Sequence, residues 1–198
     1  MTTAIRNNNL LPFDGEAYYY DAVIPSSLVE HYFQGLHDEI EWKHDEVIMF
    51  GKRIVTKRKV AWYGSKDFAY VYSNISRVAL PFTGMLIDLK KMAETVSGES
   101  FNSCLLNLYH DGNEGMGWHS DDENTIVKNS AIASLSFGAE RKFCFRHKQT
   151  KESISLKLGS GSLLLMKGFT QTYWHHALPK TSTIFSPRIN LTFRTMIG

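Results

Sequence analysis

RINLTFR, residues 188–194, alternates polar and apolar side chains along its whole length. In an extended strand, residues two apart point to the same side of the sheet, so this stretch has two unlike faces. One face carries four polar side chains: Arg188, Asn190, Thr192 and Arg194. If the apolar face packs on a second layer, the two guanidinium groups enter an interior where unpaired charge is costly. A small dicarboxylate between the two arginines would satisfy them, and a fully solvated strand face is the alternative.

The stretches between residue 101 and this strand indicate further strands. Short segments rich in apolar and β-branched residues alternate with turns containing Gly, Asp, Asn and Lys: NSCLLNLYH, AIASLSFG, RKFCFRH, SISLKL and GSLLLMKG. Such a series is typical of an antiparallel sandwich or barrel. With helices ahead of the strands, the expected fold class is α+β with a double-sheet barrel as its core.

Two helices are predicted in the N-terminal half. The first covers LVEHYFQGLHDEI, where Ser27 and Glu30 have the spacing of a capping box. Its expected apolar face comprises Leu28, Val29, Tyr32, Phe33 and Leu36. The second begins near Pro81, runs through MLIDLKKMAETV and stops at Gly98.

Composition indicates an ordinary globular protein in one domain, residues 1–198. The chain has 198 residues, 43% hydrophobic and 21% charged, and a net charge of +2, so any basic surface must come from local clustering. Cys104 and Cys144 are too few for a disulfide framework and are expected to be reduced. Because neither a signal peptide nor a membrane-length apolar run is visible, we expect the protein in the cytoplasm, or in the nucleus of a eukaryote. We also expect a monomer.

GWHSDDE, residues 117–123, raises the question of a metal site. His119 and Asp121 are two residues apart and leave an extended chain on the same side, which suits two ligands of one metal. A non-haem iron site needs a further histidine, and YWHHALPK offers His175 and His176, only one of which can point inward. The remaining histidines are expected to be surface, structural or solvated: His31, His37, His44, His110 and His147. An acidic turn without metal is the alternative.

LLNLYHDG adds two polar side chains of interest. Asn107 and Tyr109 share one face of this predicted strand, opposite two leucines. An amide and a phenol that point inward beside two arginines indicate further donors to an anionic co-substrate. Packing of Tyr109 as a core aromatic is the alternative.

Together these segments resemble a known family. NLYHDGNEGMGWHSDDE, ASLSFGAERKFCFRHK, GSLLLMKGFTQTYWHHALPK and SPRINLTFR are similar, in order and spacing, to the AlkB family of iron(II)/2-oxoglutarate dioxygenases. The resemblance covers roughly residues 45–197 and implies a double-stranded β-helix, or jelly-roll, core. It implies that iron is bound by His119, Asp121 and His176. It also implies contacts to 2-oxoglutarate from Asn107, Tyr109, Arg188, Thr192 and Arg194, with Asn190 on the same face.

The same resemblance implies a chemistry. With iron(II), 2-oxoglutarate and O2, members of this family hydroxylate an N-methyl group of a damaged base. The hydroxylated methyl group is then lost as formaldehyde, and 2-oxoglutarate is converted to succinate. Methyl groups on Watson–Crick nitrogens prevent pairing, so such a base is also easier to flip out of a duplex. The implied partner is nucleic acid, in particular alkylated DNA carrying 1-methyladenine or 3-methylcytosine.

The N-terminal hundred residues are therefore expected to form helices and a nucleotide-recognition lid, ahead of the jelly-roll at about 101–198. GKRIVTKRKVAWYGSK, residues 51–66, has six basic and no acidic residues, which fits phosphate contacts or a solvated hairpin. Tyr70 and Tyr72 share a face suited to stacking on a base, or pack in the core.

Within the family, the chain looks most similar to the animal members that repair double-stranded DNA. That likeness implies substrate contacts from Met49, Phe50, Gly51, Arg58, Tyr70, Tyr72, Ser73, Asp122 and Glu123. TSTIFSP, residues 181–187, lacks the basic residues of those members, and the turn KQTKES is short. A single-stranded DNA or RNA substrate, a hydroxylase of another substrate and a non-catalytic binder of damaged DNA are the alternatives.

Overall fold

The computed structural model describes residues 8–49, 52–72 and 75–197. Its elements, in chain order, are β1 (Glu16–Tyr20), α1 (Ser26–Glu39), β2 (Lys43–Met49), β3 (Lys52–Gly64), β4 (Ala69–Tyr72), β5 (Ile75–Val78), β6 (Leu80–Pro81), α2 (Gly84–Ser97), β7 (Ser103–Tyr109), β8 (Met116–His119), β9 (Ile132–Gly138), β10 (Arg141–His147), β11 (Ser153–Leu158), β12 (Leu163–Lys167), α3 (Thr170–Tyr173), β13 (Trp174–Leu178) and β14 (Arg188–Arg194). No described helix combines the length and the apolar character needed to cross a membrane.

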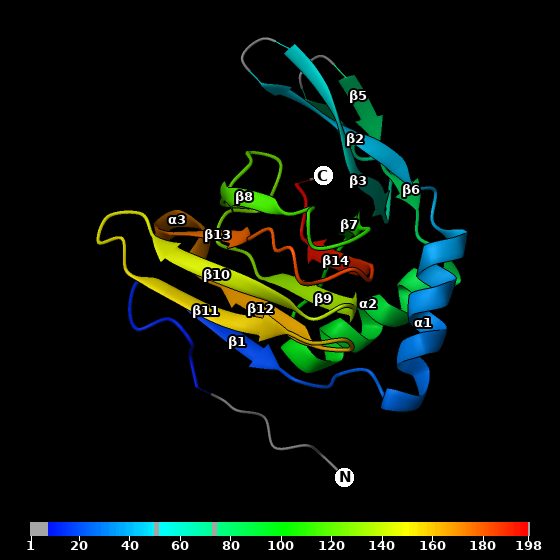
Figure 1. Cartoon of the computed structure of the whole chain (residues 1–198). Coiled ribbons are helices and arrows are strands. Elements are labelled where there is room, and N and C mark those ends of the chain that lie inside the picture. The colour runs from blue at the N-terminus through cyan, green and yellow to red at the C-terminus, as the bar shows by residue number, and fades with distance from the viewer. Residues whose placement is uncertain (1–7, 50–51, 73–74, 198) are drawn as a thin grey trace.

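Two sheets, antiparallel except for the β3–β6 pair, face each other in the core (Figure 1). The larger sheet has the order β1-β12-β9-β14-β7-β3-β2, with β6 paired to β3, and the smaller has the order β11-β10-β13-β8. Helices α1 and α2 cover the outer face of the larger sheet. The predicted α+β class with a double-sheet, jelly-roll core is confirmed.

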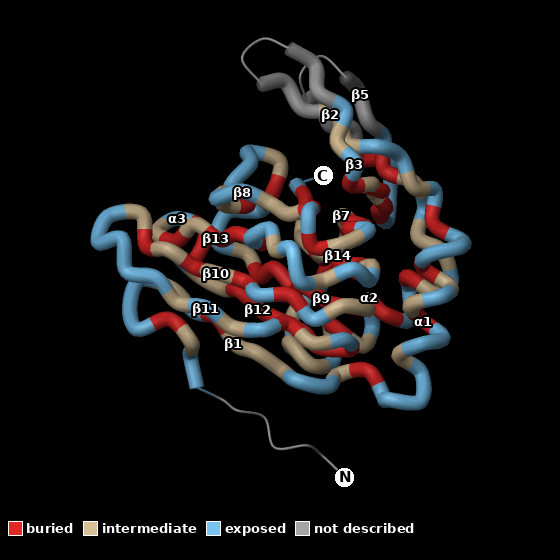
Figure 2. Tube along the Cα trace, viewed as in Figure 1, coloured by how far each residue is buried: buried red, intermediate tan, exposed pale blue. Residues whose placement is uncertain are grey.

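Apolar side chains fill two layers, one on each side of the larger sheet. Figure 2 shows the buried positions along the strands of both sheets. Between this sheet and the helices lie Leu36, Leu89 and Leu135, all fully buried. Between the two sheets lie residues such as Phe145 and Trp174, also fully buried. Because this sheet is covered on both faces, six of the seven residues of β9 are buried.

The six strands predicted after residue 101 are all present, but the N-terminal half differs from the prediction. β1 pairs with β12, and β3 pairs with β7, so segments before residue 65 extend the larger sheet at both ends. These segments were expected to form helices and a lid. Their pairing partners lie 39 or more residues away in sequence, so the local sequence pattern gives little indication of them.

Both predicted helices exist, with corrected ends. α1 begins after Pro25, and because no side chain caps it, the predicted capping box is wrong. Of its expected apolar face, Tyr32 and Leu36 are buried whereas Leu28 is exposed. α2 begins at Gly84, three residues beyond Pro81, where the Thr83 hydroxyl accepts a bond from the backbone N–H of Leu86.

Candidate metal and co-substrate site

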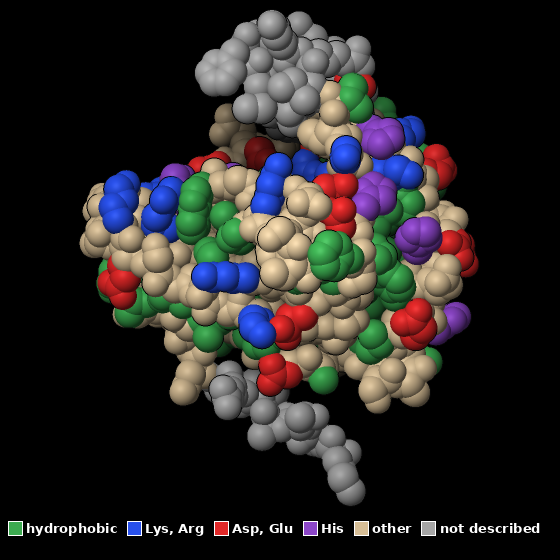
Figure 3. Space-filling view, in the orientation of Figure 1, with side chains coloured by type: hydrophobic (Ala, Val, Ile, Leu, Met, Phe, Trp, Pro, Cys, Tyr) green, Lys and Arg blue, Asp and Glu red, His purple; other side chains and the backbone are tan. Residues whose placement is uncertain are grey.

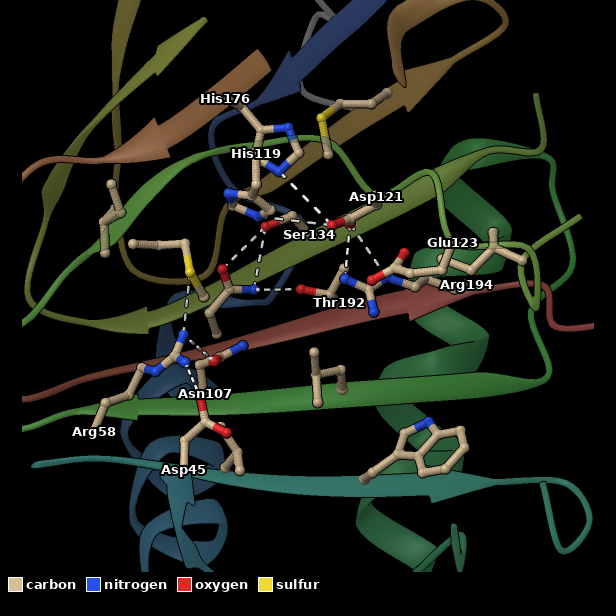
Figure 4. A pocket seen from close by; sticks show the side chains of 18 of the residues that line it. Asp45, Arg58, Asn107, His119, Asp121, Glu123, Ser134, His176, Thr192 and Arg194 are labelled. Atoms are coloured by element: carbon tan, nitrogen blue, oxygen red, sulfur yellow. Dashed lines mark hydrogen bonds and ion pairs between the residues drawn. The ribbon is translucent and has the colours of Figure 1, made fainter. Parts of the chain in front are cut away.

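Three side chains predicted to bind iron meet between the sheets (Figure 4). His119 ends β8 and lies opposite His176 on β13 in the antiparallel pairing, and Asp121 follows two residues after His119. One potential ligand atom from each residue lies within 4.8 Å of the others. The Nε2 atoms of His119 and His176 lie 3.7 and 3.9 Å from Asp121 Oδ1. Two imidazoles and a carboxylate in such a group match the donor set of non-haem iron sites.

Neighbouring groups orient each of these side chains. The Nδ1 atom of His119 lies 2.8 Å from the carbonyl of Gly117, which leaves Nε2 directed toward Asp121. Arg194 donates from Nε and Nη2 to Asp121 Oδ2, at 3.2 and 2.8 Å, so Oδ1 faces the histidines. The ring of Phe143 stacks on that of His176 with 5.5 Å between centroids. Such supporting contacts are typical of metal ligands.

Burial and charge set the protonation of the ligands at neutral pH. Burial lowers the pKa of His176 to about 3, against the opposing effect of Asp121, so its imidazole is neutral and keeps a free lone pair. Burial alone would raise the pKa of Asp121, but Arg194 and the two histidines outweigh it and hold that pKa below its usual value. Both groups are therefore in the form that coordinates a metal.

Arg188 is the second feature of the site. It is 1% exposed, and its guanidinium donates from Nη2 to Ser136 Oγ at 2.9 Å and to Asn190 Oδ1 at 3.3 Å. Among the described residues no carboxylate pairs with it, and its Nε has no hydrogen-bond partner. Burial lowers the pKa of Arg188 to about 10, and Tyr109 opposes that effect. A buried, charged guanidinium without an anion is costly, so the surroundings of Arg188 fit the carboxylate of a ligand.

One cavity of about 360 Å³ joins the two features. Its lining includes the nine residues that the sequence analysis assigned to iron and 2-oxoglutarate: Asn107, Tyr109, His119, Asp121, His176, Arg188, Asn190, Thr192 and Arg194. This volume suits a small organic ligand. Arg194 donates from Nε and Nη2 to Asp121, whereas no described carboxylate pairs with Arg188. The assignment of both arginines to 2-oxoglutarate stays a prediction.

Several residues that support the site were not predicted. Ser134 and Ser136 on β9 contact Asn190 and Arg188, and Gln171 accepts a bond from the backbone N–H of Asp121 at 2.9 Å. The two serines alternate with apolar residues in AIASLSFG, so period-two reading of that strand was the signal that could have found them. Gln171 lies in the short helix α3, and nothing in its sequence marks it.

The histidines that were set aside have mixed outcomes. His110 is exposed and lies 3.0 Å from Glu114, as expected for a residue at a strand end. His147 was expected to be solvated, which is wrong: it is 1% exposed and packs against Trp174 and Phe13. His175 is partly exposed and pairs with Arg146 across the strands, on the face away from His176.

Residues predicted to contact the substrate are distributed unevenly. Glu123 and Arg58 line the cavity, whereas the carboxylate of Asp122 is exposed and lies 3.6 Å from Lys148. Arg58 is 8% exposed and paired with Asp45, so its assignment to a free basic cluster for phosphate is wrong.

The remaining predicted contacts lie on β2 and β4 or outside the described residues. Phe50, Gly51 and Ser73 lie outside the described residues. Met49 ends β2, and Tyr70 and Tyr72 belong to β4, which pairs with β5. Figure 1 shows the β2–β3 and β4–β5 hairpins rising beyond β8 and the C-terminal end of the chain.

Comparison with known proteins agrees with this geometry. The family model of the 2OG-Fe(II) oxygenase superfamily matches residues 16–194. DNA oxidative demethylase ALKBH2 of Bos taurus is 36% identical over 90% of this chain and 68% of its own length, and that of Mus musculus is 35% identical over 93% and 82%. Alpha-ketoglutarate-dependent dioxygenase alkB homolog 3 of Homo sapiens is 38% identical over 81% of this chain and 59% of its own length.

A solved structure gives the same fold. The structure of OsALKBH1 superposes with a TM-score of 0.65 over 94% of this chain and 99% of the other, at 13% sequence identity. At such low identity the likeness concerns the fold alone.

Proposed function

The chain belongs to the AlkB family within the 2OG-Fe(II) oxygenase superfamily, and on this basis we propose that it repairs alkylated DNA by oxidative demethylation. The observation that carries the proposal is one cavity that combines the group His119, Asp121 and His176 with a buried arginine lacking a carboxylate partner among the described residues. The relatives named DNA oxidative demethylase support the choice of substrate.

In this proposal His119, Asp121 and His176 hold iron(II), and Arg188 binds one carboxylate of 2-oxoglutarate. When bound, iron(II) and 2-oxoglutarate supply the oxidising chemistry that hydroxylates the N-methyl group with O2. Arg194 keeps one oxygen of Asp121 occupied, which fixes the oxygen that faces the histidines. The buried, neutral imidazole of His176 binds metal without first releasing a proton at neutral pH.

Other residues around Arg188 complete the proposed co-substrate site. Tyr109 lies with its ring 5.7 Å from the guanidinium, and Asn190 and Ser136 hold the guanidinium in place. Their hydrogen bonds restrict the direction in which Arg188 meets a carboxylate. Because these groups are buried, water competes weakly for them, which strengthens an ion pair with the ligand.

The surface around the cavity supports a nucleic-acid substrate. Trp118, 39% exposed, lies beneath the guanidinium of Arg146 at 4.1 Å, and Lys148 and Lys151 follow in the β10–β11 turn. Figure 3 shows Lys and Arg side chains gathered at this end of the molecule. Basic and aromatic groups together are typical of surfaces that bind phosphates and bases. We assign base recognition to Glu123 and Asp122, and to Met49, Phe50, Gly51, Tyr70, Tyr72 and Ser73.

The direct test measures formaldehyde and succinate released from 2-oxoglutarate, with iron(II) and an oligonucleotide containing 1-methyladenine or 3-methylcytosine. We expect release that depends on the methylated base. Turnover no higher than with the unmethylated oligonucleotide, in protein that binds iron, would overturn the proposal.

Single-stranded and double-stranded oligonucleotides of the same sequence would then be compared. The segment 181–187 beside β14 contains no Arg, and its Phe185 is 82% exposed. Such a surface offers few phosphate contacts, which favours single-stranded over double-stranded DNA. We further propose that the protein is a monomer, located in the cytoplasm, or in the nucleus of a eukaryote.

A further inference from the structure

Arg58 and Asp45 form a buried ion pair on the wall of the cavity that neither the metal group nor Arg188 requires. Arg58 lies on β3 and Asp45 on β2, their side chains are 10% and 14% exposed, and both line the cavity. Removing charged groups from water is costly, so such a pair needs a reason beyond stability.

The backbone is irregular where this pair forms. The register of β2 and β3 shifts between His44, which faces Lys59, and Glu46, which faces Val55. The bulge is closed by a contact of His44 Nδ1 with the carbonyl of Thr56, at 3.0 Å. Bulges next to functional sites commonly redirect a side chain, and here Asp45 and Arg58 both reach the cavity.

Arg58 also contacts side chains on β7 and β8. Its Nη1 donates to the side-chain oxygen of Asn107 on β7, at 3.1 Å, and lies 3.4 Å from the sulfur of Met116 on β8. A guanidinium has donors and no acceptor, so Asn107 must present its oxygen to Arg58. The N–H₂ group of Asn107 then points away from Arg58, as Figure 4 shows.

The three arginines of the cavity differ in whether a carboxylate neutralises them. Of three arginines in its lining, Arg58 is paired with Asp45 and Arg194 with Asp121. Arg188 is the one that no described carboxylate neutralises. A dianionic ligand is therefore attracted toward Arg188, and Arg58 can act on Asn107 without binding the ligand itself.

We propose that Asp45 and Arg58 are positioning residues that fix the amide of Asn107, so that its N–H₂ group donates to 2-oxoglutarate in the cavity. This inference rests on the proposed function, because it takes 2-oxoglutarate as the ligand beside Asn107. Asp45 holds the guanidinium, the guanidinium holds the amide oxygen, and the amide is thereby pre-organised for the ligand.

The test compares 2-oxoglutarate binding in a double variant and the wild type. Asp45→Asn with Arg58→Met removes both charges together, so no buried ion is left unpaired and the net charge is unchanged. 2-Oxoglutarate is titrated by calorimetry into the iron(II)-loaded protein without oxygen and without DNA. We expect the dissociation constant to rise about fivefold, the effect of losing one net hydrogen bond, and kcat at saturating 2-oxoglutarate to stay within about twofold.

A double-mutant cycle then asks whether the effect passes through Asn107. In an Asn107→Ala background, the same pair of substitutions should change the dissociation constant less than about twofold. The matched control, Lys90→Met with Glu94→Gln, removes the ion pair of Lys90 and Glu94 in α2. It should leave the dissociation constant for 2-oxoglutarate unchanged. If the double variant unfolds, Arg58→Lys is used instead. This change keeps the charge but loses the planar set of guanidinium donors, and it should still weaken 2-oxoglutarate binding.

The outcomes separate this inference from the proposed function. An unchanged dissociation constant, or an equal loss in the Asn107→Ala background, would overturn the inference. A raised KM for DNA with unchanged 2-oxoglutarate binding would also overturn it, and would assign Arg58 to the substrate. Because the titration contains no DNA, a protein that shows the expected binding changes but no demethylation would overturn the proposed function alone.

Discussion

Adjacent histidines in one strand have opposite environments. His176 is 5% exposed and faces Asp121 and Phe143, whereas His175 is on the other face, opposite Arg146. Alternation along an extended strand requires this difference, but it does not say which of the two points inward. The pairing of β13 with β8, which places His176 against His119, makes that choice.

The first prediction concerns this choice. His176→Ala should weaken iron(II) binding more than about 100-fold. Mutation of a residue that only supports a ligand lowers metal affinity roughly 10–100-fold, and loss of the ligand itself should cost more. His175→Ala is the matched control and should keep most of the affinity. Binding is measured by anaerobic metal titration with a competing chelator. The reverse ranking of the two variants would contradict the assignment.

A second prediction follows from the protonation of His176. Its pKa is about 3 in the folded protein against 6.5 for a free histidine, so between these values the unfolded chain binds more protons. Stability of the metal-free protein should therefore fall as the pH falls below 6.5, and this residue accounts for roughly 2 kcal/mol of loss by about pH 5.

Urea unfolding in the presence of a chelator measures this dependence. His176→Gln, which does not titrate, should lose less stability over the same pH interval, and the difference between the two proteins isolates this histidine. Equal losses in both proteins would show that His176 is not buried as a neutral group.

Among the elements, β14 shows how one strand serves two functions. Its polar face carries Arg188 near one end and Arg194 at the other, and the two guanidinium groups have different partners. Arg194 orients a metal ligand, whereas Arg188 is left for an external anion. Its apolar face packs on the helices, as Ile189 and Phe193 show, and this anchors both arginines.

The end of α2 offers a third prediction. Gly98 adopts a left-handed conformation, with φ of +71°, and its N–H bonds to the carbonyl of Glu94. An added Cβ would meet no atom within 4 Å, so Gly98→Ala should cost only the backbone strain, about 1 kcal/mol. Gly84→Ala, which also has open space but no positive φ, is the control and should not destabilise α2. Chemical denaturation of both variants checks the difference, and equal stabilities would contradict it.

In the whole molecule, the two sheets have different packing roles. The larger sheet packs its outer face on α1 and α2 and, with the smaller sheet, encloses the cavity. β2 and β3 belong to this larger sheet and also continue into the hairpin beside the cavity. The Asp45–Arg58 pair lies where the hairpin leaves the sheet, which is why a change there is expected to reach Asn107.

The sequence was sufficient for features that depend on local pattern. Period-two alternation predicted β7 and β14 and the residues on their polar faces, and helical spacing with Gly98 predicted α2. The spacing of His119 and Asp121 indicated a metal pair, and the resemblance to a family supplied His176. Apart from His176, these features involve residues only a few positions apart, so neighbouring side chains alone reveal them.

Other features depend on which distant segments pair. The inclusion of β1 and β3 in the larger sheet, the burial of His147, the partner of Arg194 and the Asp45–Arg58–Asn107 contact all join residues far apart in sequence. Arg58 illustrates the limit: in a run of basic residues it looks like a phosphate contact, but the fold buries it beside a carboxylate. Burial and charge pairing are properties of packed surfaces, and they arise only when the strands assemble.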